Sequence, residues 1–433
     1  KNNQADYISL NEGTWDATSA TIDAIWANCY SMINRCNSVL DKIGNVSEKN
    51  RKQYEGEACM LRAYAYFTLV RLFGPVPLTE HVVDDYSDLY NYGRSPEKDV
   101  YALIGSDLGK AAACLPPHYS EAGKAGRATS TAAKVMMADT HMTLGDFGAA
   151  RKVLEEVIGY AKANPASLGL LDDYASVFDS QNPVNKEIIF VAQFNNGATV
   201  VANYLMKRCI PAVSPNDQPA YTMPDGTAST ILTTQGVGCL LMTWDLYNRL
   251  RSNPTDKRYS QMVYDRLYDA SQGTSRQTEE VDVNDNGDAF TPATLKYFDM
   301  HNQGLKTCAS GCDDIIYRYA DVLLMYAECL NETNATAEAK EYLDAVRHRA
   351  GLAGTQVTSQ SEMRLAIEDE RLLELCFEGH RWYDLNRTGR INKVMTAHFN
   401  HRVKGLSAPL QANNNGMAVA DCNDASGRPL EWR

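Results

Sequence analysis

Two stretches that lie far apart in this 433-residue chain repeat one pattern of apolar residues, small residues and a short turn. In Ala138–Ile158 the turn contains Gly145, and Ala150 follows it. In Ala320–Val346 the second half carries Ala339 at a similar place. Small residues let two helices approach closely, so each stretch predicts a helix, a short turn and a second helix packed against the first.

Helical periodicity extends beyond these two stretches. Apolar residues recur on one helix face at Trp26, Tyr30, Ile33 and Leu40. Helices are also expected over residues 96–114, 129–145, 147–162, 315–350 and 361–387. The spacing and the flanking Gly and Pro residues support these limits, and Ser95 is expected to cap the helix that starts at Pro96. The pattern predicts a mostly α fold, a tetratricopeptide-like scaffold of helical hairpins (an α-α superhelix) with few short strands.

The middle of the chain has a different pattern. Between about residues 163 and 311, Pro and Gly become frequent and the helical period is lost. We expect one domain over 1–433, with a helical scaffold at about 18–162 and 312–400 and a loop-rich insert at about 163–311. A short buried strand is expected at residues 187–191. Long loops on a rigid scaffold commonly carry binding functions.

Composition excludes several classes of function. With 42 Lys and Arg against 54 Asp and Glu, the net charge is −12, which disfavours a nucleic-acid partner. No apolar run reaches the roughly 18 residues of a membrane-spanning helix. The 11 cysteines form no CxxC pair and the eight histidines show no metal-ligand spacing, so buried free thiols are expected and zinc is not. No motif for a cofactor appears, and none is expected.

Three glutamates are spaced like one face of a helix: Glu370, Glu374 and Glu378. Carboxylates at this spacing can form the acid and nucleophile pair of a glycan-cleaving enzyme centred on Glu374. They can also form a structural network with arginines, which lie nearby in sequence at Arg371, Arg381 and Arg387. The structural interpretation is favoured, because buried carboxylates need cationic partners.

A second polar set interrupts apolar helical patterns: Arg35, Asn37, Glu57 and Arg62. A ligand site is one interpretation. A hydrogen-bonded cluster between helices is favoured, because buried polar groups are almost always partnered.

Several segments in a common order resemble the SusD/RagB family of nutrient-binding outer-membrane lipoproteins. The segments are Arg35 with Asn37, Gly56-Glu57-Ala58, Leu61-Arg62-Ala63, Phe73-Gly74-Pro75-Val76-Pro77-Leu78, Gly126-Arg127-Ala128, Arg318-Tyr319-Ala320-Asp321, Tyr326-Ala327-Glu328, Val346-Arg347, Arg349-Ala350-Gly351-Leu352, and Glu370-Arg371 through Glu378-Gly379-His380-Arg381-Trp382-Tyr383-Asp384-Leu385 and Arg387. Singly each motif is weak, but their joint order from about residue 22 to 390 is specific.

The resemblance implies a non-catalytic protein at the cell surface of a Gram-negative bacterium. Such a protein captures an oligosaccharide and delivers it to a SusC-like TonB-dependent transporter in the outer membrane. The resemblance also implies a lipid anchor that is not part of this sequence. A peptide- or protein-binding role on the same scaffold is the alternative.

Sugar binding requires flat aromatic faces beside a few polar groups, so we look for aromatics outside the helical pattern. The candidates are Trp15 with Asp16 near the N-terminus, Tyr86, Tyr90 and Tyr92 after Pro77, and Tyr221 in the insert. Each aromatic ring can instead cover its own loop.

A possible structural calcium site is the remaining candidate. Its oxygen-bearing residues are Asp282, Asn284, Asn286 and Asp288, with Gly287 in the sixth place. The twelfth place holds Ala293, so a full EF-hand is excluded. A partial calcium loop and a plain polar turn remain, and the turn is favoured.

Overall fold

The computed structural model describes residues 6–7, 9–10, 14–83, 87, 92–120, 124, 126–194, 202–209, 220–222, 228–230, 238, 240–269, 274–277, 292–299 and 310–405. Within these ranges the protein is mostly helical, with short strands only, as the sequence predicts.

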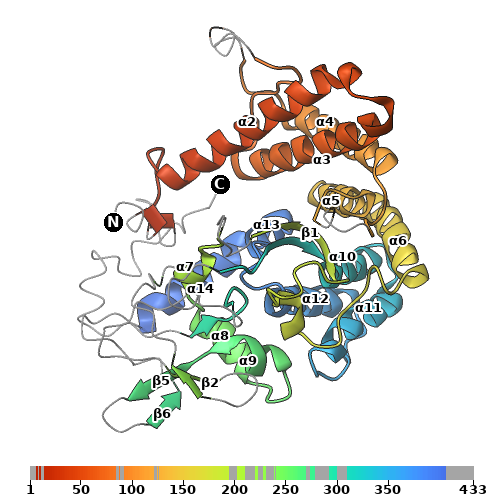
Figure 1. Ribbon diagram of the computed structural model, residues 1–433. Helices are drawn as coiled ribbons and strands as arrows, with labels where there is room; N and C mark the ends of the chain where they lie inside the picture. Colours follow the sequence, from red (N-terminus) through yellow and green to blue (C-terminus); the bar gives the residue numbers. More distant parts are fainter. Residues whose placement is uncertain are drawn as a thin grey trace.

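The N-terminal half is a run of helices in which each packs on the next (Figure 1). They are α2 (Ala20–Asp41), α3 (Glu48–Phe73), α4 (Glu97–Cys114), α5 (Ser130–Thr143) and α6 (Phe147–Ala163), with a short 3-10 helix at Ile43–Asn45. The turn between α5 and α6 uses Gly145 at φ 76°, a conformation that glycine adopts without strain. Ala150 lies fully buried just after it, where the two helices meet.

The C-terminal half continues the same stack, because α6 packs against α10. Its helices are α10 (Tyr319–Glu332), α11 (Thr336–Arg349), α12 (Gln360–Glu374), α13 (Arg381–Arg387) and α14 (Ile391–Gly405). The hairpins α5–α6 and α10–α11 are the two repeats that the sequence predicts. Among the described helices, none combines the length and the apolarity needed to cross a bilayer.

The elements between α6 and α10 are short. They are a 3-10 helix at Ala175–Phe178, β1 (Ile188–Ala192), α7 (Leu205–Cys209), β2 (Ala220–Thr222), β3 (Ala228–Thr230), α8 (Trp244–Arg251), α9 (Lys257–Met262), β4 (Val263–Tyr264), β5 (Arg266–Asp269), β6 (Thr274–Gln277), β7 (Ala293–Thr294) and β8 (Asp314–Arg318). The strands form antiparallel pairs, β1 with β8, β2 with β3, β4 with β7 and β5 with β6. In Figure 1, α8, α9, β5 and β6 lie at the end of the molecule opposite α2–α4.

The main hydrophobic core runs through the helical stack and reaches the β1–β8 pair. Tyr66 and Phe67 of α3, Leu154 of α6 and Leu324 of α10 are fully buried in it. Smaller apolar clusters lie between the insert and the scaffold, one of them around Tyr247 of α8. Cys59 and Cys329 are buried free thiols, as expected.

Two helix predictions are wrong in detail. The stretch 315–350 begins with β8 and turns into helix only at Tyr319. The stretch 361–387 is broken, because α12 ends at Glu374 and α13 begins at Arg381. In the break, Phe377 and Gly379 have φ values of 65° and 80°. This turn exposes backbone carbonyls to buried donors from other elements, described below.

Candidate functional site

The three glutamates of the predicted acidic face are buried. Glu370 and Glu374 lie on α12, but Glu378 lies in the turn beyond the helix, so one continuous acidic helix face does not exist. Their side chains are at most 1% exposed.

Cations from four other parts of the chain pair with these glutamates. Arg318, at the end of β8, donates to Glu187 at 2.9 Å, to Glu374 at 2.6 Å and to Glu378 at 2.7 Å. The other pairs are Arg258–Glu370 at 2.6 Å, Arg258–Asp256 at 2.8 Å, Lys296–Glu378 at 2.6 Å, Arg349–Glu187 at 3.1 Å, Arg347–Glu370 at 3.1 Å and Arg349–Glu374. We call this set the central ion cluster.

The broken helix end belongs to the same cluster. The Glu374 carbonyl accepts from Tyr174 Oη at 2.9 Å, from Lys296 Nζ at 3.0 Å and from Arg318 Nη2 at 2.8 Å. Lys296 also donates to the carbonyl of Cys376 at 2.8 Å. Continued helix would occupy these carbonyls, so the buried donors stabilise the turn in its place.

The structural interpretation of the glutamates is therefore confirmed, but their predicted partners are wrong. The three neighbouring arginines serve other carboxylates instead: Arg371 pairs with Asp321 at 2.7 Å and Asp384 at 2.8 Å, Arg387 with Asp384 at 2.7 Å, and Arg381 with Glu368 at 3.2 Å. The cations that pair with these glutamates are therefore close to them in space rather than in sequence.

The pKa values of these glutamates shift in different directions: burial raises the pKa of Glu370, whereas cationic partners lower those of Glu374 and Glu378. Burial alone would raise the pKa of Glu374, but the guanidinium groups of Arg349, Arg318 and Arg258 lower it to about 2. Burial is likewise outweighed at Glu378, where Arg318 and Lys296 lower the pKa to about 2. Glu370 and Glu374 do not line the cavity described below, and their ion pairs make them structural groups.

The second predicted polar set forms a buried cluster with partly different members. Arg62 donates to both carboxylate oxygens of Asp107, at 2.7 and 2.9 Å, and to the side-chain oxygen of Asn37 at 2.8 Å. Arg35 is instead exposed on α2. Glu57 accepts from Arg127, at 2.7 and 2.6 Å. The cluster thus fastens α2, α3 and α4 together.

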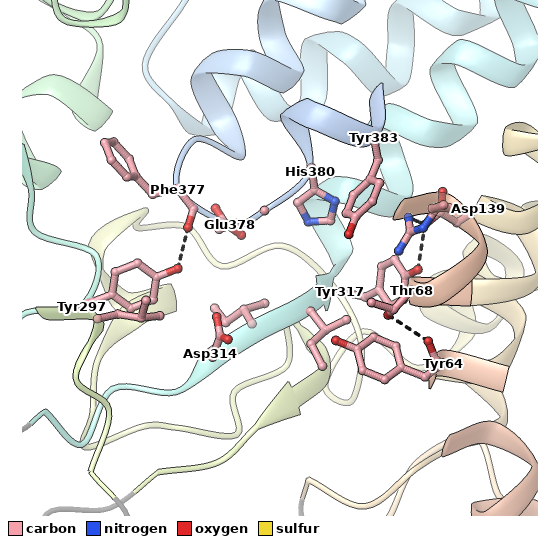
Figure 2. A pocket seen from close by; sticks show the side chains of 15 residues that line it. Tyr64, Thr68, Asp139, Tyr297, Asp314, Tyr317, Phe377, Glu378, His380 and Tyr383 are labelled. Atoms are coloured by element: carbon pink, nitrogen blue, oxygen red, sulfur yellow. Dashed lines mark hydrogen bonds and ion pairs between the residues drawn. The ribbon is translucent and has the colours of Figure 1, made fainter. Parts of the chain in front are cut away.

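A cavity of about 340 Å³ lies beside the central ion cluster (Figure 2). It is half-open and is lined by residues from α3, α5, α7, the segment after β7, β8, the turn after α12 and the start of α13. Its lining consists of Tyr64, Thr68, Arg71, Asp139, Leu205, Tyr297, Asp314, Ile315, Ile316, Tyr317, Phe377, Glu378, Gly379, His380 and Tyr383. We call it the tyrosine cavity, because four tyrosines line it.

Arg71 forms part of one wall of the tyrosine cavity and contacts several of its neighbours there. Its guanidinium lies between two rings, 3.7 Å from the centre of Phe67 and 3.8 Å from that of Tyr383. It also pairs with Asp139 at 3.3 Å, and Tyr317 Oη donates to the same carboxylate at 2.8 Å. The charges of Arg71 and Asp139 therefore compensate each other.

The opposite wall carries the Asp314 carboxylate. Burial raises the pKa of Asp314, and the charge of Glu378 raises it further. Burial also raises the pKa of Tyr64 to about 12, so its hydroxyl stays protonated. In Figure 2, Asp314, Tyr64 and Tyr383 all face the interior of the cavity.

Of the predicted sugar-binding residues whose side chains the structure describes, Trp15, Asp16 and Tyr92, none lines this cavity. Trp15 is half-buried and Asp16 exposed in the segment that leads into α2. Asp16 accepts from the backbone N–H of Thr18 at 2.8 Å and from its hydroxyl at 2.6 Å. Tyr92 is 41% exposed between α3 and α4. Tyr221 lies in β2, where the structure describes the backbone alone.

The other predicted site residues lie outside the described residues. They are Tyr86, Tyr90, Asp282, Asn284, Asn286 and Asp288. Among the described residues, no group of His, Cys, Asp or Glu is arranged to hold a metal ion. The calcium loop therefore stays a prediction.

Comparison with known families gives the class of protein. A model described as the SusD family matches residues 186–419. A second model, described as "Starch-binding associating with outer membrane", matches residues 2–140. The first match covers more than half of the chain, so the chain belongs to the SusD family.

Individual relatives agree with this assignment. A SusD-like protein of Formosa agariphila, P2, is 27% identical over 400 residues, which is 89% of this chain and 75% of the relative. A laminarin-binding SusD-like protein of known structure is 26% identical, with a TM-score of 0.69 over 89% of this chain and 80% of its own. A SusD superfamily protein from Parabacteroides distasonis is also 26% identical, with a TM-score of 0.69 over 88% of this chain and 78% of its own.

Proposed function

We propose that this protein is a non-catalytic, cell-surface glycan-binding protein. It captures an oligosaccharide and delivers it to a SusC-like TonB-dependent transporter in the outer membrane. The observation that carries the glycan part is the similarity, over most of the chain, to a laminarin-binding member of the family. The description of the model that matches the N-terminal residues supports the outer-membrane part.

Aromatic side chains near the surface supply the means of binding. Trp15 is half-buried beside the exposed Asp16, and Tyr92 is exposed. A sugar ring stacks its C–H faces on such aromatics, while neighbouring polar groups bond its hydroxyls. The non-catalytic part is supported by the burial of Glu370, Glu374 and Glu378, the acidic set that suggested hydrolysis in the sequence.

The experiment is native gel electrophoresis through a panel of polysaccharides, with laminarin and starch included, together with an assay for new reducing ends. We expect retardation without new reducing ends. Retardation that comes with reducing ends lost in Glu374→Gln would favour an enzyme. Binding to a peptide panel, with no retardation by any polysaccharide, would favour the peptide-binding alternative.

Variants locate the glycan surface. We expect Trp15→Ala and Tyr92→Ala each to weaken retention by about three- to tenfold, the contribution of one stacked ring, with an unchanged melting temperature. Tyr54→Ala is the matched control, because Tyr54 is 39% exposed elsewhere, on α3. Full retention in both variants would contradict this placement of the site.

Delivery is tested separately by co-purification. The protein, tagged and expressed in its own host, should bring down a large TonB-dependent barrel from detergent-solubilised outer membranes. Recovery of the protein alone, from membranes that contain the barrel, would contradict delivery while leaving glycan capture intact.

A further inference from the structure

We propose that the tyrosine cavity is a binding site for one neutral sugar residue, with Asp314 as the acceptor of its hydroxyl protons. The proposal rests on the proposed function and adds a second subsite, in a half-open cavity apart from the surface aromatics. Three features carry it: unpaired polar groups, compensated charge and size.

Polar groups that face the cavity have unused hydrogen-bonding capacity. Among the described residues, none donates a hydrogen bond to the Asp314 carboxylate, and none bonds the side-chain hydroxyl of Tyr64 or Tyr383. All three face the same space in Figure 2. A carboxylate accepts from two hydroxyls, and a phenol both donates and accepts, so the set matches a ring that bears several hydroxyls.

The remaining charges of the cavity cancel locally. Arg71 is compensated by Asp139 at 3.3 Å. Glu378 is compensated by Lys296 at 2.6 Å and Arg318 at 2.7 Å. His380, which also lines the cavity, lies 3.9 Å from the Asp321 carboxylate. Asp314 is the charged group without a pairing partner among the described lining residues, so a uronic acid or a sulfated sugar would meet repulsion in a partly desolvated space. A neutral ring meets none.

Size and apolar surface complete the match. A volume of about 340 Å³ lies near the lower end of the roughly 300–1,000 Å³ of ligand cavities, which suits one pyranose ring better than an extended chain. Leu205, Ile316 and Phe377 supply apolar lining next to the tyrosine rings. Such surfaces cover the C–H faces of a sugar while the hydroxyls are bonded at the edges.

The test uses monomeric probes, namely the methyl glycosides of glucose, galactose, mannose and N-acetylglucosamine, with methyl glucuronide and glucosamine as charged probes. Binding is measured by saturation-transfer difference NMR and by titration calorimetry at millimolar probe concentrations. The variants are Asp314→Asn and Tyr383→Phe. The second removes one hydroxyl and keeps the ring that stacks on Arg71. The matched controls are the exposed Asp172→Asn and Tyr54→Phe.

We expect at least one neutral glycoside to bind, and methyl glucuronide to bind more weakly. Asp314→Asn should weaken the neutral probe by about tenfold or more, since hydrogen bonds to a charged acceptor are the strong ones. Tyr383→Phe should weaken it less, and the controls should not change it. If Asp314→Asn fails to fold, the Tyr383→Phe result and the glucuronide comparison still decide.

Several outcomes overturn the proposal. They are the absence of binding by all neutral probes, equal binding of glucose and glucuronide, preference for glucosamine through its ammonium group, and unchanged affinity in both cavity variants. Failure of the proposed function looks different, because the wild-type protein would then not be retarded by any polysaccharide. If the protein still binds polysaccharide but binds no monomeric probe, the subsite in the tyrosine cavity is contradicted and the proposed function is not.

Discussion

At the scale of single residues, Arg318 has the most demanding position. Its side chain is fully buried, and it pairs with Glu187, Glu374 and Glu378. A buried cation is costly unless carboxylates surround it, and the carboxylates are costly without it. Removal of either partner leaves an uncompensated charge.

We therefore expect Arg318→Met to lower the free energy of unfolding by about 3–5 kcal/mol. The matched control is Arg364→Met, since Arg364 also pairs with a glutamate, Glu332, at 2.7 Å but is 44% exposed. Its loss should change stability by at most about 1 kcal/mol. Denaturant unfolding followed by circular dichroism measures both. Equal effects of the two substitutions would show that burial does not decide the outcome.

The same cluster predicts how stability depends on pH. The pKa values of Glu374 and Glu378 fall from an ordinary 4.5 to about 2 on folding. Their contribution is therefore complete above about pH 4.5 and is lost as pH falls toward 2. Burial raises the pKa of Asp313 from 3.8 to about 6, so its contribution to stability decreases as the pH rises through this range, opposite to that of the two glutamates. We expect the melting temperature to fall steeply below about pH 4.5, and a flat profile down to pH 3 would contradict the ionised cluster.

At the scale of helices and strands, local rules predicted most of the structure. Helical period and capping residues placed α5 and α6 within two residues of their observed ends. The rules failed where distant groups compete for the backbone. The sequence predicts Ser95 as the cap of α4. In the structure, the backbone N–H of Ser95 donates to the carbonyl of Val76 at 2.9 Å, and Pro96 occupies the N-cap position. The break after Glu374 has the same kind of cause.

A capping residue offers a clean test at this scale. The Asp146 side chain accepts from the backbone N–H of Ala149 at 2.9 Å and so caps α6. Asp146→Ala should lower the free energy of unfolding by about 1 kcal/mol, whereas Asp146→Asn should change it little, because asparagine caps equally well. Denaturant unfolding distinguishes the two. If asparagine costs as much as alanine, the charge rather than the cap matters at this position.

At the scale of the whole molecule, the sequence predicts the helical stack and, through resemblance, the family. It does not predict the tyrosine cavity. Tyr64, Asp139, Asp314 and Tyr383 come from elements spread over most of the chain, and each sits in a pattern that also suits ordinary packing. Periodicity shows which face of a helix is buried, but not which buried faces enclose a space. The division into scaffold and insert stays a prediction.

β1 pairs with β8, and Ala192 lies opposite Asp314, so the chain that runs between them leaves and returns at neighbouring points. Because its ends are adjacent, the segment of residues 193–313 is the natural unit to exchange in a chimera with a relative. The exchange has one condition. Arg258 and Lys296 lie within this segment, whereas their counter-charges, Glu370 and Glu378, lie outside it. A chimera without matching cations would leave four buried carboxylates, Glu187, Glu370, Glu374 and Glu378, with only Arg318, Arg347 and Arg349 of the central ion cluster, so one negative charge would lose its compensation.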